Sequence, residues 1–183
     1  CIATSLSYDS GTNKTTINVV GDSLVNETIT SVLLSLSDME AIIGYSKVRA
    51  YRSNSEQIVQ SFTWTKVQLN AKNYDTQNEF DSTTNYRFTA KKSGYYLVIG
   101  SIFWKSSVDQ CYHGIYISKN GNPVTDGSIR SPGSHSFAVK VSDVIYLETN
   151  DYLELWCFQL GGFNLNIGNG SDLTFMVINR LPI

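Results

Sequence analysis

The chain has 183 residues, a formal net charge of −2 and 16% charged residues, while 12% of its residues are aromatic. This balance leaves no excess of Lys and Arg to neutralise phosphate groups, so nucleic acid is not an expected partner. No apolar run approaches the roughly 18 residues that a membrane-spanning helix needs, so we expect no membrane span. The composition favours one β-rich domain of an extracellular or virion-surface protein.

The N-terminal part differs in pattern from the rest of the chain. Strand-like runs at residues 5–8 and 15–20 flank turn-forming residues, which predicts a hairpin. Apolar residues then recur at helical spacing over residues 29–43, which predicts one short helix. We expect residues 1–45 to mount the protein or help it to oligomerise, and residues 46–183 to form the main domain.

The main domain has the pattern of short strands separated by turns. Eight strand-like runs have the spacing of a sandwich: KVRAYRS, TWTKVQLN, NYRFTA, GYYLVIGSIFWKS, CYHGIYISKNG, HSFAVKVSDVIYL, DYLELWCFQ and LTFMVINRL. Asn120 and Gly121 predict a hairpin turn between two of them. Because no helical pattern separates the strands, we expect an all-β antiparallel jelly roll or a related sandwich rather than a parallel sheet.

One of these strands has apolar residues on both faces. Within NYRFTAKKSGYYLVIG, alternate residues point to opposite sides, so Tyr95 and Leu97 lie on one face and Tyr96 and Val98 on the other. A strand with one wet face would carry polar residues at every second position. We therefore expect one face to fill the core and the other to be covered by a second layer of the chain or by a partner subunit.

Motifs of catalytic and metal sites are not evident. Cys1, Cys111 and Cys157 match no zinc spacing, and the last two lie in strand-like runs, where small buried thiols are the simpler interpretation. His113 and His135 also lie in strand patterns, without a nucleophile elbow or a paired-ligand spacing. We expect these histidines near a subunit seam or on a wet face, and we predict no enzymatic activity.

Two weaker patterns concern loop residues. Loop aspartates could supply oxygen ligands to calcium, but without a dense D-x-D loop their role in turns is the simpler interpretation, so no cofactor is predicted. These residues are Asp75, Asp81, Asp109, Asp126, Asp143 and Asp172. Sequons at Asn13, Asn26 and Asn169 would accept sugars in a source that glycosylates exported proteins.

The segment NEFDSTTNYRFTAKKSGYYLVIGSI resembles the middle of the complement component 1q globular-head family, which is related in fold to tumour necrosis factor. The shared Phe-x-x-x-x-x-Gly-x-Tyr pattern falls on Phe88, Gly94 and Tyr96, and further matches extend the resemblance over residues 47–182. It implies a jelly roll of about ten strands. It also implies a tight homotrimer, in which the strand after Gly94 contributes to the inter-subunit core.

The chain also departs from that family. It contains no collagen-like repeat, Cys111 has no second cysteine nearby, and Asn150 replaces a common glycine. Phrases such as VRAYRS and GYYLVIG are more similar to heads of phage and virus fibres and of microbial surface proteins. This similarity implies a viral or phage fibre head that binds a host-surface glycan or protein receptor. The alternatives are a structural subunit of a cell-surface appendage or coat, and a secreted cytokine-like ligand.

The residues that we expect to matter fall into two sets. The trimer and core set is Phe88, Gly94, Tyr95, Tyr96, Val98, Tyr152, Trp156, Phe158 and Phe175. The candidate ligand-binding set is Ser107, Asp109, Tyr112, Asp126, Arg130, His135, Phe163 and Asn166, in or beside the loops expected at residues 106–110, 122–135 and 160–172. Trp64 and Trp104 either join that binding surface or belong to the core.

Overall fold

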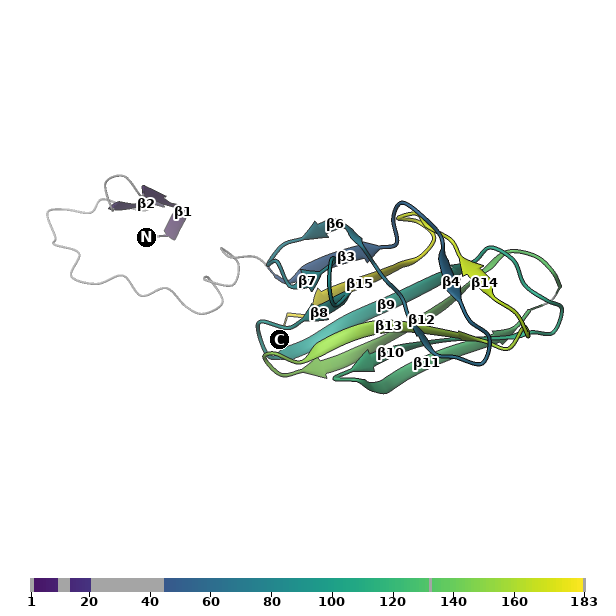
Figure 1. Cartoon of the computed structure of the whole chain (residues 1–183). Helices are drawn as coiled ribbons and strands as arrows, with labels where there is room; N and C mark the ends of the chain where they lie inside the picture. Colours follow the sequence, from purple (N-terminus) through teal and green to yellow (C-terminus); the bar gives the residue numbers. More distant parts are fainter. Residues whose placement is uncertain (1, 10–13, 21–44, 132, 183) are drawn as a thin grey trace, which may run out of the picture. The chain divides into compact units, whose positions relative to one another are not determined.

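The computed structural model describes residues 2–9, 14–20, 45–131 and 133–182. The chain divides into two units, Cys1–Asp38 and Met39–Ile183. In the first unit, β1 (Ile2–Asp9) and β2 (Lys14–Val20) pair antiparallel, which confirms the predicted hairpin (Figure 1). The helix predicted over residues 29–43 lies outside the described residues.

The second unit, which we call the head, contains a seven-stranded and a six-stranded antiparallel sheet (Figure 1). The seven-stranded sheet consists of β3 (Lys47–Tyr51), β4 (Gln57–Val59), β6 (Ala71–Asp75), β9 (Gly94–Trp104), β12 (Phe137–Leu147), β14 (Leu165–Ile167) and β15 (Phe175–Arg180). Its order is β4-β14-β9-β15-β3-β6, and β12 also pairs with β9.

The six-stranded sheet consists of β5 (Thr65–Lys66), β7 (Phe80–Asp81), β8 (Arg87–Thr89), β10 (Tyr112–Lys119), β11 (Asn122–Arg130) and β13 (Tyr152–Gln159). Its order is β11-β10-β13-β8-β7, and β5 also pairs with β13. The described residues contain no helix that is long and apolar enough to span a membrane.

The core lies between the two sheets, and β9 is its central strand. Tyr96 is fully buried, and its ring meets that of Phe88 edge-on with centroids 5.5 Å apart. Gly100 allows a close approach to the opposite sheet, because a Cβ there would lie 2.6 Å from Leu155 Cδ1. Trp104 is also fully buried, so of the two interpretations of this side chain the core one is confirmed.

The predicted fold class is confirmed, but two expected loops contain strands. Residues 122–130 form β11, because the turn at Asn120 and Gly121, with φ of 53° and 84°, folds the chain directly back onto β10. Within the loop expected at residues 160–172, Leu165–Ile167 forms β14. Asp126 and Arg130 therefore lie on an edge strand, and Asn166 lies in a sheet.

Candidate functional site

The first candidate surface is the outer side of the seven-stranded sheet around β9. Tyr95, Leu97 and Ile99 alternate with the buried residues of β9, so they point outward there. On β12, Tyr146 pairs with Tyr95 and Val144 with Leu97. Tyr95 is 49% exposed, Val144 is 48% exposed, and the two tyrosine rings meet edge-on with centroids 5.1 Å apart. The described residues thus leave an apolar patch uncovered.

The same side of the sheet continues over β15 and β3, where Val177 is buried and Phe175 is half-buried. Val177 pairs with Ile99, and Phe175 pairs with Tyr51 of β3. The Arg49 guanidinium lies 4.0 Å from the centre of the Phe175 ring. Its Nη2 donates a hydrogen bond of 2.6 Å to the Ser171 carbonyl oxygen. A cation over the ring face is attracted by the ring quadrupole, which fixes Phe175 in place. We call this surface, formed by outward residues of β3, β9, β12 and β15, the β9 face.

The structure divides the predicted trimer and core set among three places. Phe88, Gly94, Tyr96 and Val98 are buried within the sandwich. Tyr95 and Phe175 lie on the β9 face, so the strand has one core face and one uncovered face. Tyr152, Trp156 and Phe158 alternate with buried residues of β13, so they lie half-buried on the outer side of the six-stranded sheet.

A second candidate surface covers that outer side. The Trp64 ring lies across β10 at Gly114, where a Cβ would come within 3.1 Å of Trp64 Cη2. Its centroid is 4.4 Å from that of Tyr116 and 4.9 Å from that of Phe158. Tyr116 in turn stacks on Trp156 at an interplanar angle of 7°. We call this row, completed by Tyr112, the aromatic ridge: Trp64, Tyr112, Tyr116, Trp156 and Phe158.

A pair of charged groups contacts the aromatic ridge at Trp156. Lys66 Nζ lies 2.7 Å from Glu154 Oε1 and 5.7 Å from the centre of the Trp156 ring. Trp156 Nε1 donates a hydrogen bond of 3.0 Å to Glu154 Oε2. The polar edge of Trp156 is therefore satisfied within the chain. Trp64, at the other part of the ridge, remains 42% exposed.

The candidate ligand-binding residues are scattered. Ser107, Asp109, His135 and Phe163 lie in the loops at residues 105–111, 131–136 and 160–164, at the end of the sandwich marked by Trp104, which we call the distal end. Ser107 is buried, whereas Asp109, His135 and Phe163 are exposed. Tyr112 belongs to the aromatic ridge. The sequons at Asn13 and Asn26 lie outside the described residues, and Asn169 is half-buried.

His113 is a core residue rather than a residue of a seam or a wet face. Its ring meets Trp104 and Phe137 edge-on, with centroids 4.6 Å and 4.8 Å away. Nδ1 lies 3.1 Å from the Cys111 carbonyl oxygen, and Nε2 lies 3.4 Å from Ser107 Oγ. Burial lowers the pKa of His113 below its ordinary value. Because Ser107 is buried as well, substrate cannot reach this pair, and we assign it a structural role.

A hollow of about 550 Å³ lies between β7, β8 and the end of β6. Its charged groups already have partners in the chain. Lys72 Nζ lies 3.0 Å from Asp75 Oδ2. The Asp81 carboxylate accepts hydrogen bonds from the backbone N–H groups of Thr83 and Thr84, which hold its pKa well below the ordinary value. These side chains stabilise turns, as the simpler interpretation of the aspartates predicted.

The titratable side chains in the described part of the head form no candidate metal site or reactive thiol site. No three His, Cys, Asp or Glu side chains of the described residues gather where they could hold a metal ion. Cys111 and Cys157 are free and buried, and burial raises the pKa of both thiols. They match the interpretation as small buried side chains. The exposed aromatic surfaces therefore remain as the candidate functional site.

Comparison by sequence finds no protein-family profile and no curated protein that matches this chain. Comparison by structure finds matches in the solved structures. Murine APRIL at pH 5.0 matches with a TM-score of 0.60 and 13% identity, over 75% of this chain and 100% of that chain. Eiger TNF from S. frugiperda matches with a TM-score of 0.58 and 10% identity, over 75% and 93% of the two chains.

A third match is the globular domain of zebrafish complement 1qA protein, with a TM-score of 0.55 and 16% identity, over 76% of this chain and 98% of that chain. At such low identity the likeness concerns the fold. The head is a jelly roll of the complement 1q and tumour necrosis factor type, as the resemblance in the sequence implied.

Proposed function

We propose that this chain is a non-enzymatic homotrimeric recognition domain, displayed on an outer surface as the head of a viral or phage fibre. In this role it binds a glycan or a protein receptor of the host surface. The observation that carries the trimer is the uncovered β9 face. Tyr95 and Val144 expose about half of their surface on adjacent strands, and a contiguous apolar patch of this kind is typical of a subunit interface.

The recognition role is supported by the second surface. Aromatic side chains concentrate on the outer side of the six-stranded sheet, which is the layer opposite the β9 face, and further exposed aromatic side chains lie in the loops of the distal end. A trimer that buries its β9 faces would leave these side chains free for a ligand. Loops and strand ends on a rigid sandwich are common positions for binding residues.

A binding assay tests this function on the full chain. The labelled protein is applied to cells of candidate hosts and to a glycan array, and its solution mass is measured by light scattering at several dilutions. We expect a stable trimer that binds a host surface saturably. A monomer, or a trimer that binds neither cells nor glycans, would refute the proposal.

A structural subunit of an appendage or coat is the second candidate, supported by a specific observation. Among the described residues β11 forms strand pairs with β10 alone, and although β12 lies close to it at Gly127, a strand from a neighbouring unit could add to the remaining part of this edge. A chain that begins at Lys47 distinguishes the two functions. It stays a binding-competent trimer if the chain is a fibre head, and it loses the ability to form polymers if residues 1–45 join successive units.

A further inference from the structure

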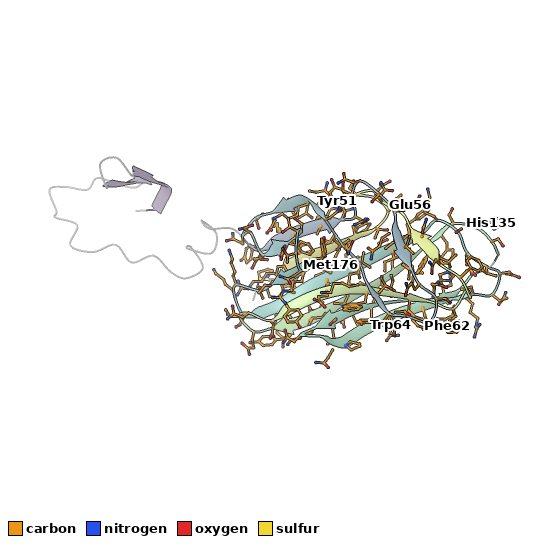
Figure 2. The ribbon with its side chains drawn as sticks, viewed as in Figure 1. Tyr51, Glu56, Phe62, Trp64, His135 and Met176 are labelled. Atoms are coloured by element: carbon orange, nitrogen blue, oxygen red, sulfur yellow. The ribbon has the colours of Figure 1, made fainter. Side chains whose placement is uncertain are left out.

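Two loops at the distal end present large apolar side chains to solvent. Phe62 is 69% exposed and Phe163 is 56% exposed, while Leu160 and Trp64 are each exposed by about two fifths. In Figure 2, which has the same view as Figure 1, Phe62 lies farther than Trp64 from the end of the head where Figure 1 marks the C-terminus. We call these four residues the distal tip. Exposure of so many large apolar groups on adjacent loops is typical of an interaction site.

Hydrogen bonds join the two loops to each other and to the end of β13. The fully buried Gln159 donates from Nε2 to the Phe163 carbonyl oxygen at 2.7 Å, and it accepts at Oε1 from the Gly161 N–H. The Phe62 N–H donates to the Gln159 carbonyl oxygen at 2.9 Å. The N–H of Gly162 donates to Ser61 Oγ at 2.9 Å. A ligand would therefore meet an ordered surface and would pay little conformational entropy on binding.

Phe62 adopts a backbone conformation that its residue type disfavours. Its φ is +62°, in the left-handed region where non-glycine residues are uncommon. The hydrogen bond from its N–H to Gln159 helps to hold this conformation. Strained residues of this kind cluster at ligand-binding positions, because the surrounding structure is selected to maintain them. The strain is a second observation, independent of exposure, that favours a binding role.

The chemistry of the tip is aromatic and uncharged. Residues 57–65 and 155–171 contain no Asp, Glu, Lys, Arg or His. The exposed polar groups beside the rings are amides and hydroxyls, from Gln60, Thr63 and Asn164. Charged residues on this side of the sheet, Asp126 and Arg130, lie on β11 opposite Tyr116 and Tyr112 rather than in the tip loops. The tip loops themselves therefore offer no counter-charge to an anionic lipid, to a sulfated or sialylated glycan, or to a charged peptide. Their surface matches a ligand that combines neutral hydroxyl groups with an apolar face.

We propose that the distal tip binds a neutral glycan, with one sugar ring stacked on Trp64. The C–H groups on one face of a pyranose carry partial positive charge, and they are attracted by the negative face of the indole. Phe62 and Phe163 flank the sugar, while Gln60 and Asn164 hydrogen bond its hydroxyls. This inference rests on the proposed recognition function and names its ligand class and its site.

The inner side of Trp64 is prepared for such stacking. Gly114 lets the indole lie close to β10, and Tyr116 and Phe158 support it from beneath. An alanine at Gly114 would place a methyl group 3.1 Å from Trp64 Cη2, which is closer than ordinary van der Waals contact. The ring would then have to move while the chain keeps every aromatic group. Gly114→Ala thus tests the position of the ring separately from its presence.

The test applies the full chain to an array of neutral, sialylated and sulfated glycans and measures the affinity of the bound sugars by calorimetry. We expect neutral glycans to bind, and we expect Trp64→Ala and Phe62→Ala to weaken the affinity about tenfold or more, as substitutions of central aromatic anchors commonly do. Gly114→Ala should weaken it less. Val124→Ala truncates an exposed apolar residue outside the tip, on β11, and should leave the glycan affinity unchanged. Circular dichroism confirms that each variant is folded.

Three results would overturn the inference. They are binding of charged glycans alone, equal affinity of the wild type and both tip variants, and the absence of any bound glycan. If the wild type still forms a trimer that binds host cells in these cases, the recognition function stands and only the ligand or site is wrong. If it binds no surface at all, the recognition function fails as well. Loss of cell binding by Phe62→Ala without any glycan binding would identify a protein partner instead.

Discussion

Burial of His113 predicts a specific loss of stability in mild acid. The side chain is fully buried, and burial lowers its pKa in the folded state below the value of 6.5 that applies in the unfolded chain. Between these two pKa values the unfolded state binds more protons than the folded state. The contribution of neutral His113 is therefore complete above the unfolded pKa and is lost as the pH falls toward the folded pKa.

The size of this effect follows from proton linkage. One such group changes the free energy of unfolding by at most about 1.4 kcal/mol per pH unit within the window. Urea denaturation between about pH 7.5 and pH 5 measures the change above the range where most carboxyl groups titrate. We expect His113→Phe to flatten the dependence of the free energy of unfolding on pH, whatever the stability of the variant at neutral pH. The exposed His135 serves as the control, since His135→Gln should retain the wild-type dependence.

The test compares how steeply the free energy of unfolding changes with pH in the wild type and the two variants. A wild type and a His113→Phe variant with the same dependence on pH would show that the imidazole does not titrate differently in the two states. A flattened dependence in His135→Gln alone would place the effect on the wrong histidine. Either result would refute the assignment of His113 as a neutral core residue that bonds the Cys111 carbonyl and Ser107.

Three further substitutions test the core and a turn by urea denaturation. Phe88→Ala should lower the free energy of unfolding by about 3–5 kcal/mol, because it opens a cavity beside Tyr96. Gly100→Ala should lower it by about 1–3 kcal/mol, because the new Cβ would lie 2.6 Å from Leu155 Cδ1. The lowered pKa of Asp81 gives stability that is complete above its unfolded pKa of 3.8 and is lost as the pH falls below it, so Asp81→Asn should reduce the loss in strong acid.

Matched variants sharpen these three predictions. Leu155→Val should recover part of the loss caused by Gly100→Ala, since it removes the methyl group that would clash. Simple additivity of the two changes would contradict the assumed contact. Phe88→Leu should cost clearly less than Phe88→Ala. An Asp81→Asn variant that denatures in acid as the wild type does would show that this carboxylate does not stabilise its turn.

The sequence predicts those parts of the fold whose residues alternate or turn in a recognisable way. The Asn120-Gly121 pair predicts a hairpin that the structure contains, and the apolar runs predict β9, β10, β13 and β15. The sequence predicts a loop where β11 lies, because this segment is mostly polar and contains Pro123, and in the structure nearly all of its residues are exposed. Hydrophobic periodicity cannot report a strand that buries neither face.

The positions of single side chains depend on tertiary contacts that no local pattern contains. Tyr95 and Tyr96 are adjacent and alike in sequence, but only the structure shows that Tyr95 faces outward. His113 has no local sign of its burial against Trp104. Phe62 was missed as a tip residue, although the uncharged run around it is a signal that composition alone could have revealed.

The trimer through the β9 face is the central claim, and sedimentation equilibrium tests it most directly. Two valines with similar exposure on different sheets, Val144 at 48% and Val124 at 43%, provide a matched pair. We expect the wild type and Val124→Asp to sediment at three times the chain mass of 20.4 kDa, and Val144→Asp as a folded monomer, because an unpaired carboxylate cannot be buried in the interface. A monomeric wild type, or a Val144→Asp variant that remains a trimer, would contradict the account.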